Sequence, residues 1–141
     1  CGIRAVRNPF EPARAWARAT VFRTPALWMR ALQVKLLHRY ATEFNLAVNE
    51  EQMNTTQGTA GMIATGMLDQ ELLTAILQGL PEGDWELVCH PGYLDADLQR
   101  AGTRLLQSRQ TELKALTSLE TRKVLDGKGI QLISYADLQQ S

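Results

Sequence analysis

The sequence has no run of about 18 apolar residues, so no membrane-spanning helix is expected. It also lacks an excess of either charge, because 15 lysines and arginines balance 15 aspartates and glutamates. A chain without net charge provides no global field that would attract nucleic acid or an anionic membrane surface. We therefore predict neither of these partners.

Cysteine is scarce, with only Cys1 and Cys89 in the chain. Two isolated cysteines do not make a disulfide framework, and they fit a reducing compartment, so a cytoplasmic location is expected. The sequence contains no CxxC, no HExxH and no glycine-rich phosphate loop. The common short motifs for metal and nucleotide sites are therefore missing.

The length of 141 residues is sufficient for one domain with a hydrophobic core, and we treat residues 1–141 as a single domain. Basic residues are concentrated in its first forty positions, where Glu11 is the only acid. A solvated helix face explains this pattern, and a basic surface that binds a partner is the alternative. The basic residues concerned are Arg4, Arg7, Arg14, Arg18, Arg23, Arg30, Lys35 and Arg39.

The first part of the chain predicts a strand and a long helix. Residues 3–7 alternate apolar and basic side chains before Asn8-Pro9, which favours a short strand. Because the chain opens in this strand and without methionine, we expect an upstream segment. Residues 11–24 predict a partly helical stretch. Thr24-Pro25 is typical of a helix start, and apolar residues then recur every three or four positions to about Phe44.

Histidine and aromatic side chains in and near this helix are candidates for function. His38 lies on its polar flank and is expected at the surface. Trp16, Trp28 and Tyr40 could form a platform for sugar rings, but aromatic residues at helical spacing more often lie in the core. We therefore expect Trp16, Trp28 and Tyr40 to be buried.

Residues 51–67 predict a short strand followed by a polar loop. Thr55, Thr56 and Gln57 would then lie where that strand ends. Loops held by a rigid scaffold often carry binding groups, although a plain connector explains the same residues equally well.

The remaining sequence alternates helices with strands. It predicts a helix over residues 69–77, a strand over 85–90, a long helix from 95 to 116, a helix over 117–125 and a last strand over 130–135. Parallel neighbours need a crossover of a dozen or more residues, and helices supply it here. The sequence therefore predicts an α/β fold with roughly four mostly parallel strands.

The most informative stretch is Trp85–Tyr93, WELVCHPGY. It is typical of a strand that runs into His90 and is stopped by Pro91 and Gly92. Side chains alternate along a strand, so His90 and Glu86 share one face. Barrel-type α/β proteins carry their reactive groups at the carboxyl ends of strands. A histidine that only caps the turn is the alternative.

Glu86 would lie about four residues of strand, or ~13 Å, deeper than His90. A buried carboxylate needs a partner to remain charged. We predict that Arg4 or Arg7 supplies it. Cys89 faces the opposite side from His90, so these two residues do not form a nucleophile and its base.

Residues 86–95, ELVCHPGYLD, resemble the YdjC-like carbohydrate deacetylases, which include chitooligosaccharide deacetylases and hopanoid-biosynthesis members. The similarity continues in SRQTELKALTS at 108–118 and in GIQLISY at 129–135. It also includes GIRAVR at 2–7 and TTQG at 55–58, and so spans essentially the whole chain.

The resemblance implies a (β/α) barrel, of which this chain would be the C-terminal half, a partial barrel. Members use a divalent metal, Mg or Zn, to activate the water that attacks the acetamide of an N-acetylated sugar. The family's Asp-Asp-Phe-Gly and His-x-His motifs are not in this sequence. The resemblance therefore assigns no metal ligand here and implies that the chain alone is inactive.

The resemblance gives His90 the role of the acid that protonates the leaving amine, or of a substrate contact. It also implies a set of substrate-binding residues, namely Arg4, Arg7, Thr56, Gln57, Glu86, Pro91 and Gly92.

A non-catalytic binding or assembly module is the alternative function. A half barrel leaves two sheet edges open, and open edges pair readily with other strands. The partner would be a missing N-terminal half or a second copy of the chain in a homodimer.

Overall fold

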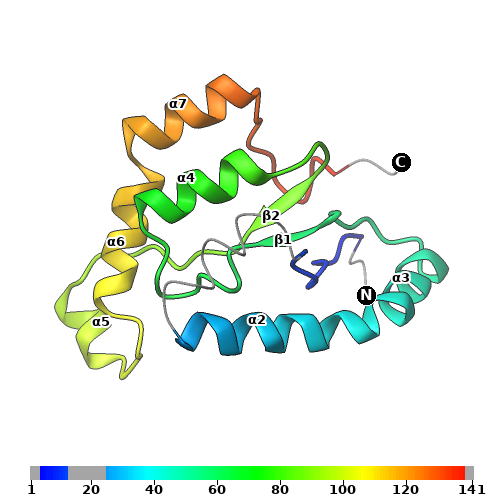
Figure 1. Cartoon of the computed structure of the whole chain (residues 1–141), viewed down its shortest axis with the longest axis horizontal. Coiled ribbons are helices and arrows are strands. Elements are labelled where there is room, and N and C mark those ends of the chain that lie inside the picture. Colours follow the sequence, from blue (N-terminus) through cyan, green and yellow to red (C-terminus); the bar gives the residue numbers. More distant parts are fainter. Residues whose placement is uncertain (1–3, 13–24, 139–141) are drawn as a thin grey trace.

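The computed structural model describes residues 4–12 and 25–138. Trp16 and the stretch 13–24 lie outside these residues. The described part is an α/β fold, as predicted, in which a small parallel sheet lies between helices (Figure 1). Its elements are α2 (Pro25–Leu37), the 3-10 helix η1 (His38–Tyr40), α3 (Ala41–Glu50), β1 (Gly58–Ala60), α4 (Gln70–Gly79), β2 (Trp85–Leu87), α5 (Ala96–Arg100), α6 (Gln107–Leu116) and α7 (Leu119–Lys128).

The sheet consists of β1 and β2, which run parallel with Gly58 opposite Trp85 and Ala60 opposite Leu87. One more hydrogen bond continues the ladder, because Val88 N donates to Ala60 O at 2.8 Å. The carboxyl ends of both strands therefore lie side by side, which is the arrangement that the alternating pattern predicts.

The predicted four-stranded partial barrel is not confirmed. Within the predicted first strand, the described residues contribute one parallel bridge, between Ala5 and Asn54. Beyond it the chain stays extended alongside β1, where Phe10 O accepts Thr59 N at 3.1 Å. Pro9 has no N–H to donate, which limits a regular ladder at this edge.

The predicted last strand, 130–135, is not a strand in the structure. Its end bends into a turn in which Ser134 N donates to the Asp137 carboxylate and Asp137 N donates to Ser134 O. Most of its apolar side chains lie open to solvent, with Leu132 78% exposed. With little burial to hold it, the segment does not join the edge of β2.

Two predicted helices differ in extent. The long helix over 95–116 is in fact α5 and α6, interrupted by Gly102, whose φ of +62° ends the first of them. The helix that begins at Pro25 runs past Phe44 as α2, η1 and α3, to Glu50.

The helix ends behave as their sequences indicate. Asp69, where the predicted helix over 69–77 begins, is the N-cap of α4, because its carboxylate accepts Leu72 N at 2.9 Å. Ser118 caps α7 through Thr121 N at 3.0 Å. Gly129 closes α7 in the left-handed conformation, with φ 65°.

The hydrophobic core lies between α4 and the sheet. Leu73 and Ile76 of α4 are fully buried there, and Leu27 of α2 and Ala60 of β1 reach the same cluster. Leu87 packs against it from β2. This face of the sheet is therefore the covered face, and Glu86 points to the other side by alternation.

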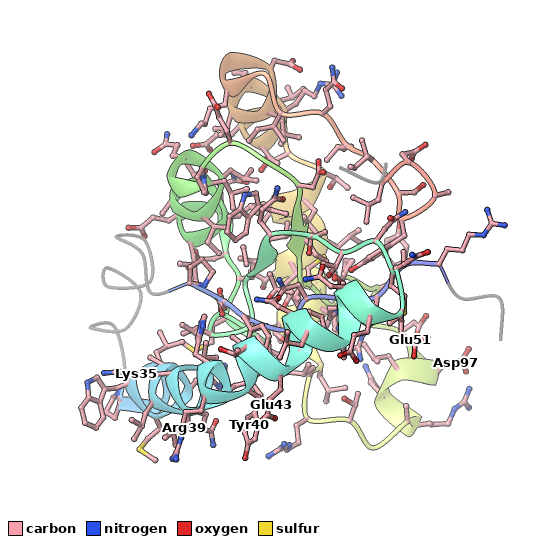
Figure 2. All side chains as sticks on the ribbon, turned by 90° about the vertical axis from the view of Figure 1, so that its right-hand side faces the viewer. Lys35, Arg39, Tyr40, Glu43, Glu51 and Asp97 are labelled. Atoms are coloured by element: carbon pink, nitrogen blue, oxygen red, sulfur yellow. The ribbon has the colours of Figure 1, made fainter. Side chains whose placement is uncertain are left out.

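The outer face of α2 and η1 is open to solvent, contrary to the expectation for its aromatic residues. Trp28 and Tyr40 are each 60% exposed. Figure 2 shows Arg39 and Tyr40 of η1 and Glu43 of α3 along the side of these helices that faces away from α4. Since inward positions such as Leu27 already fill the core, the outward aromatic residues find no cover in the part of the chain described.

No helix among residues 4–12 and 25–138 has both the length and the apolar character that crossing a membrane requires.

Candidate functional site

The carboxyl ends of β1 and β2 bring two short segments together. Gly61 follows β1 directly, and its backbone packs against the chain after β2 so closely that a Cβ there would lie 2.7 Å from Val88 O. His90 comes two residues after Val88. The predicted strand over 85–90 is shorter in the structure, because β2 ends at Leu87, so His90 is not the last strand residue but lies three residues beyond it on the carboxyl side. Its predicted catalytic role stays a prediction.

Helix α6 holds the histidine and the turn that follows it. The carboxylate of Glu112 accepts the backbone N–H of His90 at 2.5 Å through Oε2. Gly92 N donates to Arg109 O at 3.1 Å, one helical turn earlier. Helix α6 thus accepts two backbone N–H groups of the segment that follows β2. These two hydrogen bonds fix the path of the His90-Pro91-Gly92 turn.

Two side-chain atoms at this point remain without a hydrogen-bond partner. Both His90 Nδ1 and Glu112 Oε1 are buried, and neither bonds to another atom of the described residues. The Glu112 side chain lies deep, since the residue is 1% exposed. His90 and Glu112 are therefore joined by one hydrogen bond, while one further polar atom of each residue is buried without a described partner.

A second buried carboxylate contacts the segment that follows β1. Glu11, also 1% exposed, accepts Gly61 N at 2.7 Å and Ile63 N at 2.8 Å, one with each oxygen. Burial raises the pKa of Glu11, and the backbone amides of the 61–63 segment oppose this shift. The backbone oxygen of Glu11 also lies 2.7 Å from His38 Nε2.

The predicted partner of Glu86 is confirmed as Arg7, whose guanidinium bonds both carboxylate oxygens, with Nε to Oε2 at 2.9 Å. Tyr135 completes the group by donating its hydroxyl to Glu86. Burial and the Glu86 carboxylate raise the pKa of Tyr135 to about 12, which Arg7 partly offsets. Glu86 is thus a charged group with two side-chain partners.

Other predicted substrate contacts are engaged elsewhere. Thr56 and Gln57 come before β1 begins at Gly58, so the expectation that they end a strand is wrong. Thr56 is buried and its hydroxyl donates to Gly58 O at 3.1 Å. Gln57 Oε1 accepts Asp84 N at 2.6 Å, at the amino end of the strands. These side chains bond within the fold, on the side of the sheet remote from His90.

Two further predicted residues lie at the surface. Arg4 is exposed, and its backbone oxygen accepts Asn54 N at 2.8 Å. Pro91 is exposed in the turn after His90, where Gly92 is half-buried. Their predicted contacts with substrate stay predictions.

A cavity of about 350 Å³ lies beside β2, between its edge and the segment 130–135. Glu86 and Tyr135 line it, together with apolar residues such as Leu73 and Leu77. His90 does not line it. The structure therefore divides the predicted site residues between this cavity and the turn that α6 holds.

The residues that the structure describes do not form a metal site, because no three of their His, Cys, Asp and Glu side chains converge. They do not fit the divalent metal that the resemblance implies. Cys89 is also unsuited to nucleophilic chemistry. Burial raises the pKa of its thiol, and the carboxylates of Glu112 and Glu86 raise it further.

Reasoning from the sequence missed Glu11, Glu112 and Tyr135. A signal existed for Glu112, because it lies three residues before Ala115 and so on the same side of a predicted helix as an apolar residue that is buried. A signal existed for Glu11 as well, since it is the only acid among the first forty residues. Tyr135 gave none beyond its place in the final predicted strand.

The chain is similar to proteins of known family. The YdjC-like protein family matches residues 1–127. A carbohydrate deacetylase from Clostridium beijerinckii (strain ATCC 51743 / NCIMB 8052) is 29% identical over 97 residues. The match covers 65% of this chain and 39% of that protein, so the chain spans well under half of its relative's length. No solved structure matches. The resemblance carried by the ELVCHPGYLD segment is thereby confirmed, and the chain belongs to the YdjC-like protein family.

Proposed function

We propose that this chain supplies part of the active site of a carbohydrate deacetylase. The reaction is hydrolysis of the acetamide of an N-acetylated amino sugar, free or in a glycolipid, with release of acetate. The observation that carries the proposal is the place of His90, at the carboxyl edge of two parallel strands and fixed by α6. The carbohydrate deacetylase of Clostridium beijerinckii gives further support.

His90 acts as the proton donor. When water adds to the acetamide carbonyl and the C–N bond breaks, the departing amine nitrogen must gain a proton, and an imidazole is suited to give it near neutral pH. In the family a divalent metal would activate the water. The described residues do not fit such a metal, so no step is assigned to it here.

Glu86 and Arg7 contribute binding. A carboxylate and a guanidinium that already pair with one another present acceptors and donors in a fixed geometry. Sugar hydroxyls both donate and accept hydrogen bonds, so such a pair suits them. Their role is to orient the sugar, and the chemistry lies at His90.

The test is acetate release from N-acetylglucosamine oligomers. The chain alone, with Mg²⁺ or Zn²⁺, is expected to release none. A protein in which this chain is completed by the remaining part of the Clostridium beijerinckii deacetylase should release acetate. In it, His90→Ala should lower kcat at least about 100-fold, as the loss of a general acid does.

The matched control is His38→Ala, which changes the chain's other histidine, on η1. It should leave kcat within about twofold, because the contacts of His38 with the described residues are to Glu11 O and the ring of Phe10, away from the His90 turn. Full activity in the His90 variant, or turnover by the chain alone, would contradict the proposal.

A non-catalytic assembly module is the second candidate, and exposed apolar side chains favour it. Trp28, Leu36 and Tyr40 are each more than half exposed on α2 and η1, and Leu132 is exposed beside the open edge of β2. Light scattering coupled to size exclusion tests it. A stable monomer at high concentration would count against assembly between copies.

A further inference from the structure

The contact between Glu112 and His90 is incomplete. Oε2 of the carboxylate accepts the backbone N–H of His90, while Oε1 and the ring atom Nδ1 are buried and unbonded among the described residues. Buried polar atoms without a partner are rare, since each costs about 1–3 kcal/mol. Two such atoms on residues that already touch are best explained together.

We propose that Glu112 is a positioning residue for His90. Its Oε1 takes the proton of Nδ1, directly or through one water, and leaves Nε2 as the ring atom that meets the substrate. The proposal rests on the proposed function, which gives His90 its reactive role. It adds what orients the ring and selects its tautomer.

The chemistry of the two groups fixes the direction of this bond. A carboxylate only accepts hydrogen bonds, so the ring atom that faces Glu112 must carry a proton. In a neutral imidazole one nitrogen donates and the other accepts. Placing the proton on Nδ1 makes Nε2 the acceptor, which is ready to take up a proton and deliver it.

His38 provides an internal contrast. Its Nε2 lies 2.7 Å from the backbone oxygen of Glu11, and a carbonyl oxygen also only accepts. His38 must therefore carry its proton on Nε2. The chain is expected to hold its two histidines in opposite tautomers.

The experiment reads both rings in one spectrum. In the ¹⁵N-labelled chain at about pH 8, where unperturbed histidines are neutral, long-range ¹H–¹⁵N correlations distinguish the tautomers. We expect the Nδ1–H form for His90 and the Nε2–H form for His38. Finding Nε2–H at His90 in the unmodified chain would overturn the proposal without any variant.

Glu112→Gln should invert the His90 tautomer. The single amide oxygen of glutamine must accept the His90 backbone N–H, so its NH₂ group faces Nδ1 and requires an acceptor there. The expected result is a switch of His90 from Nδ1–H to Nε2–H, with His38 unchanged as evidence that the fold persists. An unchanged His90 signal in the folded variant would overturn the proposal.

Two controls separate this pairing from general effects. Ser108→Ala removes a buried hydroxyl of α6 that also lacks a partner in the described part, one turn before Glu112. Glu120→Gln removes an exposed carboxylate from α7. Neither should change the His90 tautomer.

The same measurement distinguishes the two proposals. The tautomer requires no turnover, so the expected spectra together with an inactive completed enzyme would reject the deacetylase role and keep the pairing. Acetate release that depends on His90, with the opposite tautomer, would reject the pairing alone.

Discussion

The carboxyl ends of β1 and β2 are each held by a buried glutamate, but the two glutamates differ in how many of their oxygens are hydrogen-bonded. At the carboxyl end of each strand, the chain that leaves the sheet donates backbone N–H groups to a glutamate from elsewhere in the sequence, and each of these glutamates is 1% exposed. Glu11 uses both oxygens, on Gly61 and Ile63. Glu112 uses one, on His90, and keeps the other free of any described partner.

The difference separates a structural carboxylate from one available for chemistry. A carboxylate whose two oxygens both accept backbone amides has its main acceptor directions filled, and its effect is to hold a loop. A carboxylate that holds the backbone of a histidine with one oxygen has its other oxygen available to orient the imidazole, as we propose for Glu112. The count of occupied oxygens, more than burial, distinguishes the two glutamates.

Removing Glu11 should produce the largest effect. Glu11→Ala leaves two buried N–H groups unpaired and should lower the free energy of unfolding by about 3 kcal/mol or more. Glu112→Ala unpairs one and should cost about 1–2 kcal/mol. Urea denaturation of both variants measures the two costs. Equal costs would contradict the contrast between the two strand ends.

Glu11 should also give the folded chain a characteristic pH dependence. Its pKa is raised above the ordinary value of 4.5, so the folded chain binds this proton more tightly than the unfolded chain does. The resulting stability is present below pH 4.5 and is lost as the pH rises through the raised value. Compared with Glu11→Gln, which does not titrate here, the chain should lose stability on going from pH 4 to 7. A relative gain over this range would contradict the shift.

The two glycines at the strand ends sharpen the comparison with a smaller effect. Gly61 has φ +95°, and a Cβ there would lie 2.7 Å from Val88 O, so Gly61→Ala should cost about 2 kcal/mol. Gly92 has no such strain, because its Cβ would meet Arg109 atoms at 3.5 Å or more. Gly92→Ala should stay within about 0.5 kcal/mol. Thermal unfolding of the pair measures this, and the reverse order would show that the end of β2 is the tighter one.

The sequence allowed prediction of features that local chemistry determines. The predicted helices over 69–77 and 117–125 begin close to where they were expected, at Asp69 and Ser118, because an N-cap needs only a side-chain oxygen and the next few amides. The parallel pairing of β1 and β2 after a helical crossover follows from an equally local pattern, although β2 ends at Leu87 and stops three residues short of His90. Arg7 was found as a partner because a carboxylate inside a sheet requires one.

Long-range contacts were not predictable in the same way. Glu11 bonds amides fifty residues away, and nothing near it in the sequence indicates which loop it holds. The segment 130–135 is apolar enough for a strand, yet its pairing depends on burial that the described chain does not provide. The sequence predicts a strand that ends at Thr56 and Gln57, whereas β1 follows these residues, because a run of small polar residues does not indicate which side of it is extended.

Glu86 extends the comparison to a third carboxylate, whose partners are the side chains of Arg7 and Tyr135. Side-chain partners near solvent hold a charge less firmly than buried amides, so the loss of Glu86 should be the mildest of the three for stability.

The clearest signature of Glu86 is the Tyr135 hydroxyl, whose pKa is raised to about 12 by burial and by Glu86. The stability linked to Tyr135 is present below pH 10, and falls as the pH rises toward 12. Glu86→Gln should move the phenolate absorbance transition of Tyr135 back toward pH 10, because the negative charge is gone while burial remains. Tyr135→Phe identifies that transition among the three tyrosines of the chain. If Glu86→Gln left it near 12, burial alone would account for the shift, and Glu86 would be a partner of Arg7 only.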